Sequence, residues 1–499
     1  MTTIHAAPAA GCRRRGSAGP TGERGMALML ALLVLVLLST FGFALLGLSQ
    51  TEIQEASRQR DSSQALSIAD AATERARAEL NRRLDTIPGK VDFDTELTTN
   101  GGYIYGAASD PGAFVDLVSG GSAVGQYRVQ IVNNHTGPLP DGGSATDDRD
   151  RAVYALATGQ RTVLGHTLRR RIEVFLAPSP LAGFTMGCGE PTQQLLNISG
   201  NPTVTGSKGS VHSNCNFNTS GTPTISQNVT AVGTITNTGT PNIGGQQTPG
   251  VPPVTIPAIV PTDYKTSGYM QVGDYVMKET AAPAKAEIYQ VTGFDGTGNP
   301  IVGGVPVFDA TGGGTWPGGG GGWSYSGTPG AGGTWQWGGN NLPAQIQNKA
   351  FYFEKAPGTT AGVQSGNVEI AASPGSDPIP WKVTIIAEGH IAVSGNPTMQ
   401  AADQAKNILM IAGTDISNSG NASSTWSGGG IIAAHEQISL AGNQPEFVGL
   451  FLAENAAATD PFVTSTSISG NPTITYNGAP APPAAWKLPL IRVAWRELP

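Results

Sequence analysis

Few residues in this 499-residue chain have the types and spacing that catalysis or metal binding requires. The six histidines form no His-Glu-x-x-His pair and the three cysteines form no Cys-x-x-Cys pair, which are the patterns of zinc sites. The sequence has no Gly-x-x-x-x-Gly-Lys-Ser/Thr loop for phosphates and no Gly-x-Ser-x-Gly nucleophile turn. The acidic stretch 141–150 lacks EF-hand spacing, so a solvated hairpin loop is the better interpretation than a calcium loop. We therefore predict no catalytic residue, no metal site and no cofactor.

Two close acid–histidine pairs keep one enzymatic alternative open. Glu388 lies two residues before His390, and His435 directly precedes Glu436. Both pairs follow short β-rich segments, and carboxylates with histidines could act as general acids and bases on a polysaccharide. Such pairs are also frequent by chance, so the prediction is that the protein is not an enzyme, with a β-helix carbohydrate-active enzyme as the less favoured alternative.

The elements that position the rest of the chain begin with an apolar segment. No charged residue occurs between Gly25 and Glu52, and about 20 apolar residues suffice for a helix to cross the hydrocarbon core of a bilayer. We predict a transmembrane helix over 26–48. Four arginines precede it within the basic leader 1–25, which indicates a cytoplasmic N-terminus in a single-pass inner-membrane protein whose remainder is exported.

A helical pattern continues beyond the membrane segment. Residues 51–84 contain no proline or glycine and are rich in Ala, Glu, Arg, Gln and Leu. Apolar positions such as Leu66, Ala69, Ala76, Leu80 and Leu84 recur at helical intervals. The sequence thus predicts one long rod, half of it apolar all round and half amphipathic, which is suited to packing against other elements.

The N-terminal region, about 20–90, resembles PilX-type minor pilins and related type IV pilin-like proteins. The resemblance rests on Glu23-Arg24-Gly25-Met26-Ala27-Leu28, on the apolar run, and on the later Ser67-Ile68-Ala69-Asp70-Ala71-Ala72-Thr73-Glu74. It implies that a prepilin peptidase cuts after Gly25 and that the new N-terminus at Met26 is methylated. It also implies that the apolar helix packs among other pilin subunits; the assembly residues are Leu30, Leu33, Val36, Leu45 and Leu48.

Position 30 points to a low-copy role within that family. Major pilins have a glutamate at the fifth mature residue, and this chain has Leu30 there. A carboxylate in lipid is costly unless it is paired, so its absence favours a minor or initiating subunit over a bulk one. The partners implied are other pilins and the pilus or secretion assembly machinery.

Composition limits the remaining partners. The formal net charge is −7, and only 13% of residues are charged, while the chain contains 68 glycines. An acidic exterior is unfavourable for binding nucleic acid, so we predict no nucleic-acid partner.

A β-rich head is expected after the helix. Hydrophobic and polar residues alternate over 125–132, 152–157 and 168–176, which predicts an antiparallel meander with one wet face. The predicted fold class is accordingly α+β followed by all-β, with a pilin-like module over 26–180.

Cys188 and Cys215 are the only cysteine pair beyond the leader. Export to an oxidising compartment favours a disulfide between them, while two separate buried thiols stay an open alternative.

A repeat dominates residues 190–485. Ser-Gly-Asn-Pro-Thr starts at Ser199, Ser394 and Ser469, and variants place successive turns 18 to 28 residues apart between short β-rich segments. This spacing predicts the rungs of a parallel β-helix, with an irregular two-layer β domain as the alternative. The region resembles, more weakly, bactofilin-like right-handed β-helix proteins.

Two further segments complete the predicted organisation. An insert over 245–380 is rich in glycine and tryptophan; we expect a mobile exposed loop with candidate surface-binding aromatics, or alternatively aromatics that fix the loop onto the solenoid. The aromatics are Trp316, Trp323, Trp335 and Trp337. The final segment, 486–499, is expected to cap the last rung.

These features predict a minor pilin-like structural protein of a type IV pilus or type II secretion pseudopilus, at low copy or at the tip. The alternatives are a signal-anchored surface adhesin and a polymer-forming β-helix protein.

Overall fold

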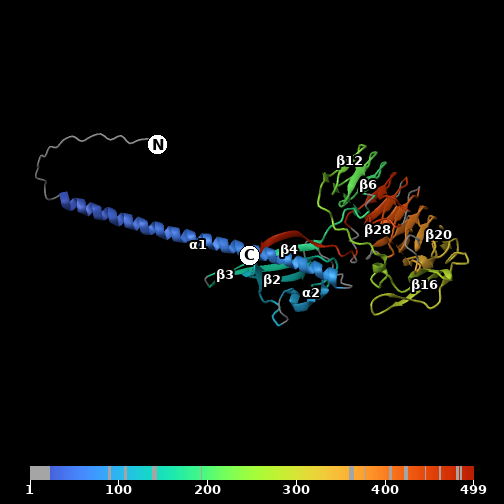
Figure 1. Cartoon of the computed structure of the whole chain (residues 1–499), viewed down its shortest axis with the longest axis horizontal. Helices are drawn as coiled ribbons and strands as arrows, with labels where there is room; N and C mark the ends of the chain where they lie inside the picture. Colours follow the sequence, from blue (N-terminus) through green and yellow to red (C-terminus); the bar gives the residue numbers. More distant parts are fainter. Residues whose placement is uncertain are drawn as a thin grey trace, which may run out of the picture.

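The computed structural model describes residues 23–498 apart from several short segments. The segments left out are 88–91, 106–108, 137–142, 164, 191, 193, 359–364, 377, 404–406, 421–424, 444–445, 460–461, 479–482 and 484–485. A long helix leads into a small helix-and-sheet head, and a larger β region lies beyond the head (Figure 1).

Helix α1 spans Glu23–Thr86 without a break. Its N-terminal part projects away from the rest of the protein, and the apolar window within it has no buried residue (Figure 1). It is long and apolar enough to cross a membrane. Its C-terminal part packs on the head through a stripe of small and branched residues at helical spacing, namely Ala65, Ile68, Ala69, Ala72, Ala76, Leu80 and Leu84.

The head contains a five-stranded antiparallel sheet in the order β1-β2-β3-β4-β33. Strands β2, β3 and β4 are the expected meander, β1 adds a strand at its edge that was not predicted from the sequence, and α1 covers the apolar face of the sheet. A short helix α2 (Asp94–Thr98) and a 3-10 turn (Thr99–Gly102) follow α1. The strands are β1 Val115–Ser119, β2 Ser122–Asn133, β3 Val153–Val163, β4 His166–Pro178 and β33 Leu490–Leu498.

Two glycines in the sheet allow α1 to approach closely. A Cβ atom on Gly159 of β3 would lie 2.2 Å from the Ala65 carbonyl oxygen and 2.6 Å from the Ala69 nitrogen. A Cβ atom on Gly125 of β2 would lie 2.3 Å from Ile68 Cδ1. At Gly159 the backbones of α1 and β3 therefore approach directly beside Ala65 and Ala69, while Gly125 leaves room for the Ile68 side chain.

The C-terminal strand corrects the prediction that 486–499 caps the last rung. β33 instead pairs antiparallel with β4, from Leu490 opposite Pro178 to Leu498 opposite Arg171. The Ser179 amide also donates a hydrogen bond to the Pro489 carbonyl, 2.9 Å away. Residues 179–489 are therefore inserted between two neighbouring strands of the head sheet, and the head needs a strand that lies outside the predicted module 26–180.

The first part of the inserted region consists of short parallel strands that stack in three series. Partners are 18 or 21 residues apart, as in Val229 opposite Val211 and Phe217 opposite Leu196, which matches the spacing of the sequence repeat; only β5 and β8 are further apart, with Phe184 opposite Val211. The first series is β5 Phe184–Met186, β8 Val211–Ser213, β11 Val229–Ala231 and β14 Gln247–Pro249. The second is β6 Leu195–Ile198, β9 Asn216–Thr219 and β12 Ile235–Asn237. The third is β7 Thr203–Thr205, β10 Thr224–Ile225 and β13 Asn242–Ile243.

The later repeats continue the same stack from its other side. The chain passes through a 3-10 turn at Pro261–Tyr264 and a hairpin-rich segment before it returns. The strands of that segment are β15 Tyr275–Ala281, β16 Ala284–Phe294, β17 Pro300–Val302, β18 Phe308–Asp309, β19 Gly321–Ser326 and β20 Thr334–Gly339. A 3-10 turn (Ala344–Ile346) precedes the returning strands. These are β21 Lys349–Phe353, β22 Asn367–Ile370, β23 Trp381–Ala387, β24 Ile391–Val393, β25 Met399–Gln400, β26 Ile408–Ala412, β27 Ile416–Asn418, β28 Thr425–Ala434, β29 Ile438–Leu440, β30 Glu446–Ala453, β31 Ser467–Ile468 and β32 Thr473–Thr475.

The two groups of repeats meet in the middle of the stack. β30 pairs in parallel with β5, β31 with β6, and β32 with β7, although about 270 residues separate Thr203 from its partner Thr473. One apolar core runs through both groups. The order of the strands in space thus differs from their order along the chain, and the links to the head leave from this central junction.

Repeated glycines explain the Ser-Gly-Asn-Pro-Thr turns. A Cβ atom on Gly239 would lie 2.1 Å from the Gly221 carbonyl oxygen, and one on Gly221 would lie 2.4 Å from the Gly200 oxygen. The same contact joins Gly200 to Gly470 at 2.6 Å. Gly200, Gly221 and Gly470 also have positive φ angles. Each turn rests directly on the backbone of the next, so only glycine fits there.

The structure of the insert differs from the exposed loop that the sequence predicts. Residues 245–380 contain strands β14 to β22 rather than one long exposed loop. Antiparallel hairpins β15–β16 and β19–β20 lie at this end of the stack. Gly327, Gly330 and Gly332 have positive φ angles and lie in the connection between β19 and β20, so part of the glycine density reflects a tight turn.

Candidate functional surfaces

The N-terminal half of α1 carries more than half of the exposed large hydrophobic side chains among the described residues. Side chains on every face of the helix are exposed, and the Ser39 and Thr40 hydroxyls donate hydrogen bonds to the Leu35 and Leu37 carbonyls of the same helix. The proposed assembly residues are exposed at 68% for Leu30, 60% for Leu33, 53% for Val36, 65% for Leu45 and 61% for Leu48. A surface of this kind requires lipid or other apolar helices around it.

The predicted processing residues lie at the start of this helix. Gly25 and Met26 belong to its first turn, and Met26 is 74% exposed. The basic residues of the leader before residue 23 lie outside the described residues. The start of α1 projects away from the head (Figure 1).

A polar seam holds the other half of α1 to the C-terminal strand. Asp70 forms an ion pair with Arg492 at 2.6 Å, and the Asn81 amide oxygen accepts a hydrogen bond from the Leu490 amide at 2.7 Å. Arg82 and Arg83 both lie 2.8 Å from Glu79, and the hydrogen bond from Arg82 is the largest cause that lowers the pKa of Glu79 to about 2. The end of the chain is therefore tied to both the sheet and the helix.

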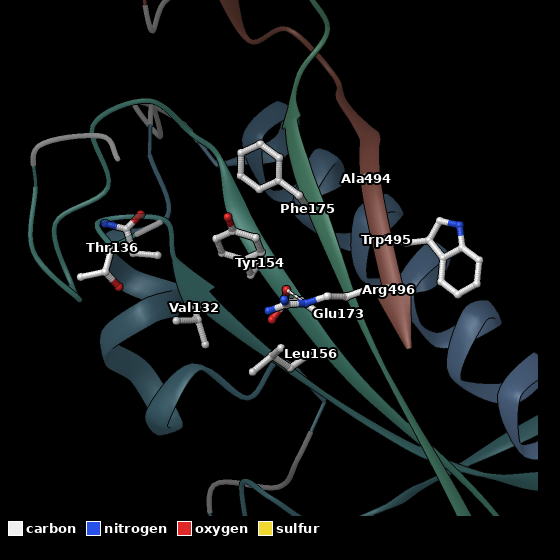
Figure 2. A pocket seen from close by; sticks show the side chains of 10 residues that line it. Val132, Thr136, Tyr154, Leu156, Glu173, Phe175, Ala494, Trp495 and Arg496 are labelled. Atoms are coloured by element: carbon white, nitrogen blue, oxygen red, sulfur yellow. Dashed lines mark ion pairs between the residues drawn. The ribbon is translucent and has the colours of Figure 1, made fainter. Parts of the chain in front are cut away.

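A groove of about 410 Å³ lies on the outer face of the head sheet, opposite α1 (Figure 2). Tyr154 and Phe175 line it as a tilted aromatic pair with ring centroids 4.9 Å apart. Glu173 and Arg496 form an ion pair at 2.7 Å beside the rings. Trp495 belongs to the rim, but its ring points away from the groove (Figure 2). The groove needs β33 as one wall, so a sequence interpretation that placed this strand elsewhere missed it.

The tryptophans of the insert do not form a binding surface. Trp323, Trp335 and Trp337 have no exposed surface, and Trp316 is partly buried against the same core. The Trp323 and Trp337 rings meet edge to face at 5.3 Å. The prediction of surface-binding aromatics is wrong, because the rings fill the end of the core beneath the hairpins.

The structure joins Cys188 to Cys215 in a disulfide, with Cα atoms 5.3 Å apart. The bond lies in the first turn of the stack, next to the strand β8. It fixes the segment between β5 and β6 to the following turn.

In each of the two acid–histidine pairs, the acid and the histidine make different contacts. The Tyr352 hydroxyl donates to Glu388 at 2.6 Å, while His390 stacks on the Phe462 ring with centroids 3.9 Å apart. Glu436 is fully buried and accepts the Thr459 amide at 2.8 Å. These contacts place no acid and histidine together in a described cavity.

His435 contacts a different carboxylate from the one beside it in sequence. Its Nδ1 lies 2.6 Å from Glu454, whose same oxygen accepts the Ile259 amide at 2.8 Å. The hydrogen bond with Glu454 raises the pKa of His435. The pair thereby attaches the segment that connects the two groups of repeats.

In the acidic stretch 141–150, the Asp148 carboxylate accepts hydrogen bonds from backbone amides. Asp148 accepts hydrogen bonds from the Phe93 amide at 2.9 Å and the Arg151 amide at 2.7 Å, and burial raises its pKa to about 7. Among the residues that the structure describes, no group of three or more His, Cys, Asp or Glu side chains could hold a metal ion.

No protein-family model matches the chain, and no curated protein matches it. Among solved structures, it is similar to the competence-associated pilin ComZ from Thermus thermophilus, at 10% sequence identity and a TM-score of 0.28. The alignment covers 88% of this chain and 97% of that chain. A likeness this distant does not indicate the function of this chain.

Proposed function

We propose that this protein is a minor pilin-like subunit that takes part in assembling a type IV pilus or a related secretion pseudopilus. The observation that supports this most directly is the division of α1 into two halves. One half is fully exposed and apolar, and the other is packed on an antiparallel sheet. A protein built this way can hold its apolar half in a bilayer and then transfer it into a bundle of similar helices.

The proposed assembly mechanism uses apolar packing rather than catalysis. A prepilin peptidase would cut after Gly25 on the cytoplasmic side, and Met26 would become the methylated N-terminus. The helix would then leave the inner membrane and pack among pilin helices through Leu30, Leu33, Val36, Leu45 and Leu48. Association of helices without a water-driven hydrophobic effect depends on close packing, which the small residues Ala27 and Ala31 of this segment favour.

The inserted β region is proposed to be displayed on the filament as a solenoid. Its parallel strand series, its repeating glycine turns and the apolar core shared by both groups of repeats support a parallel β-helix. About 310 residues inserted into the head would crowd a filament if every subunit carried them, so a low-copy or tip position is proposed.

The test is mass spectrometry of N-terminal peptides from membrane and sheared-surface fractions of the native host. An N-terminus at N-methylated Met26 in the sheared fraction is the expected result. The variant Gly25→Glu should stay at full length in the membrane and disappear from the sheared fraction, whereas Gly42→Ala, at an open position of the same helix, should behave as the parent does. Normal surface recovery of Gly25→Glu would refute the proposal, and an intact N-terminus on the surface would favour a signal-anchored adhesin.

A further inference from the structure

One end of the stacked β region is uncovered. Strands β12, β13 and β14 each pair on one side, with β9, β10 and β11, and the described chain places no strand on their other side. We call the surface formed by β12, β13 and β14 the open end. Thr236, Asn242 and Thr248 are exposed there, and Ile235 and Ile243 are only half-buried where the apolar core stops.

The open end lacks the features that normally prevent edge pairing. Natural edge strands are usually blocked by charged side chains, above all lysine, because unpaired backbone groups can otherwise bind another strand. No Asp, Glu, Lys or Arg occurs between Lys208 and Asp263, a stretch that includes all three edge strands. Two copies of this surface would meet without charge repulsion.

The opposite end of the stack is closed. Hairpins β15–β16 and β19–β20 bring antiparallel strands to it, and buried tryptophans fill the core beneath them. Among the described residues, the edge strands β17 and β18 at this end pair only with β16, but Lys285 and Glu287 of β16 and Asp309 of β18 carry charges there. The two ends therefore differ, because only the open end is free of charged residues.

The chain itself demonstrates that separate turns of the stack can join. At the central junction β31 pairs with β6 and β32 with β7, without a short connection between the paired turns. Asn201 also hydrogen-bonds Asn471 across this junction at 3.3 Å. Stacking of one turn on another thus does not require that they be consecutive in sequence.

From these observations we propose that two copies of this protein associate through their open ends. The same surface on both partners implies a twofold axis, so the edge strands of one copy meet those of the other in antiparallel orientation. Because a twofold contact occupies the open end of both copies, and the opposite end carries charged residues, the association stops at a dimer and does not continue into a fibre. This interface would cover Ile235 and Ile243 and pair the unpaired backbone of β12, β13 and β14.

The test uses the full chain in detergent with Cys12 replaced by serine, so that no free cysteine remains besides the introduced one. Thr248→Cys places a thiol at the open end, and Thr328→Cys, at an exposed loop of the closed end, is the matched control. A short bismaleimide is expected to link Thr248→Cys into dimers at least tenfold more efficiently than Thr328→Cys. Analytical ultracentrifugation of the unlinked parent should give a dimer at high protein concentration.

A second substitution separates this interface from association through the apolar helix. Adding Thr236→Lys to Thr248→Cys should reduce the linked dimer at least tenfold, because a lysine on an edge strand disfavours pairing with another strand, while Thr328→Lys should change nothing. Helix-mediated dimers would be insensitive to Thr236→Lys. The proposal is overturned if both cysteine variants link equally, if Thr236→Lys has no effect with the circular dichroism spectrum unchanged, or if the parent is a monomer throughout.

Discussion

Substitution of Gly159 tests how closely α1 must approach the head sheet. In Gly159→Ala the new methyl carbon would lie 2.2 Å from the Ala65 oxygen, 2.6 Å from the Ala69 nitrogen and 3.2 Å from the Ala69 Cα. All three are backbone atoms of the helix, so no side-chain rotation relieves the clash and the helix must move away from the sheet. Overpacking of a core costs about 1–3 kcal/mol, and contact with rigid backbone places this site near about 3 kcal/mol.

The expected loss is measured most directly by hydrogen exchange of the intact protein in detergent. A loss of about 3 kcal/mol corresponds to an increase of roughly 100-fold in the opening equilibrium, since about 1.4 kcal/mol is tenfold. Amide exchange in the helix segment 65–84 should accelerate by that factor, while exchange in the inserted β region should not change.

Gly293→Ala is the matched control for this experiment. Gly293 also lies in a strand, β16, but an added Cβ atom would meet nothing within 4 Å. If Gly159→Ala exchanged as slowly as Gly293→Ala in residues 65–84, the helix would not be packed as tightly as the described contacts require, and the reasoning would fail.

Three further perturbations probe the links around this core. Asn81→Ala should lower the free energy of unfolding of the head by about 1–2 kcal/mol, because it leaves the first amide of the C-terminal strand without its 2.7 Å acceptor; urea unfolding followed by hydrogen exchange of 490–498 measures this. The pair of His435 with Glu454 should stabilise the connecting segment fully below pH 6.5, which is the pKa of the histidine in the unfolded chain. This contribution should be lost as the pH rises through the higher pKa of the folded state. Hydrogen exchange at residues 254–264 should therefore show less protection at high pH, and His435→Gln should remove that dependence. Replacing Cys188 and Cys215 with serine should lower the stability of the β region by about 2–4 kcal/mol, as thermal unfolding of oxidised and reduced protein would show, and equal midpoints would contradict it.

Local patterns were sufficient to predict the elements that depend on neighbouring residues. The apolar run and the alanine-rich segment after it predicted α1, because both signals extend over many helical turns. The 18- and 21-residue spacing predicted that short strands stack at this interval, and the strands of the first group do pair at it. The antiparallel meander of the head followed from simple alternation.

Contacts between distant residues could not be predicted in the same way. The segment 488–495 has the apolar pattern of any half-buried strand, and nothing in it distinguishes the edge of β4 from the end of the strand stack as its partner. The outer groove depends on this pairing and was missed with it. In the insert, glycine runs resembled a flexible loop because sequence does not reveal that the intervening tryptophans are buried under tight hairpin turns.

The position of the inserted region between β4 and β33 also determines how the protein would bear mechanical load. Both covalent links, at 178–184 and 476–490, leave the same end of the head sheet, so tension on the β region is divided between two adjacent strands. The pull acts along both strands, and the hydrogen bonds that resist it in the sheet are loaded together in shear rather than broken one after another. Part of the force then passes through Arg492 and the Leu490 backbone to Asp70 and Asn81 of α1. Force applied to the inserted β region is thereby transmitted to α1.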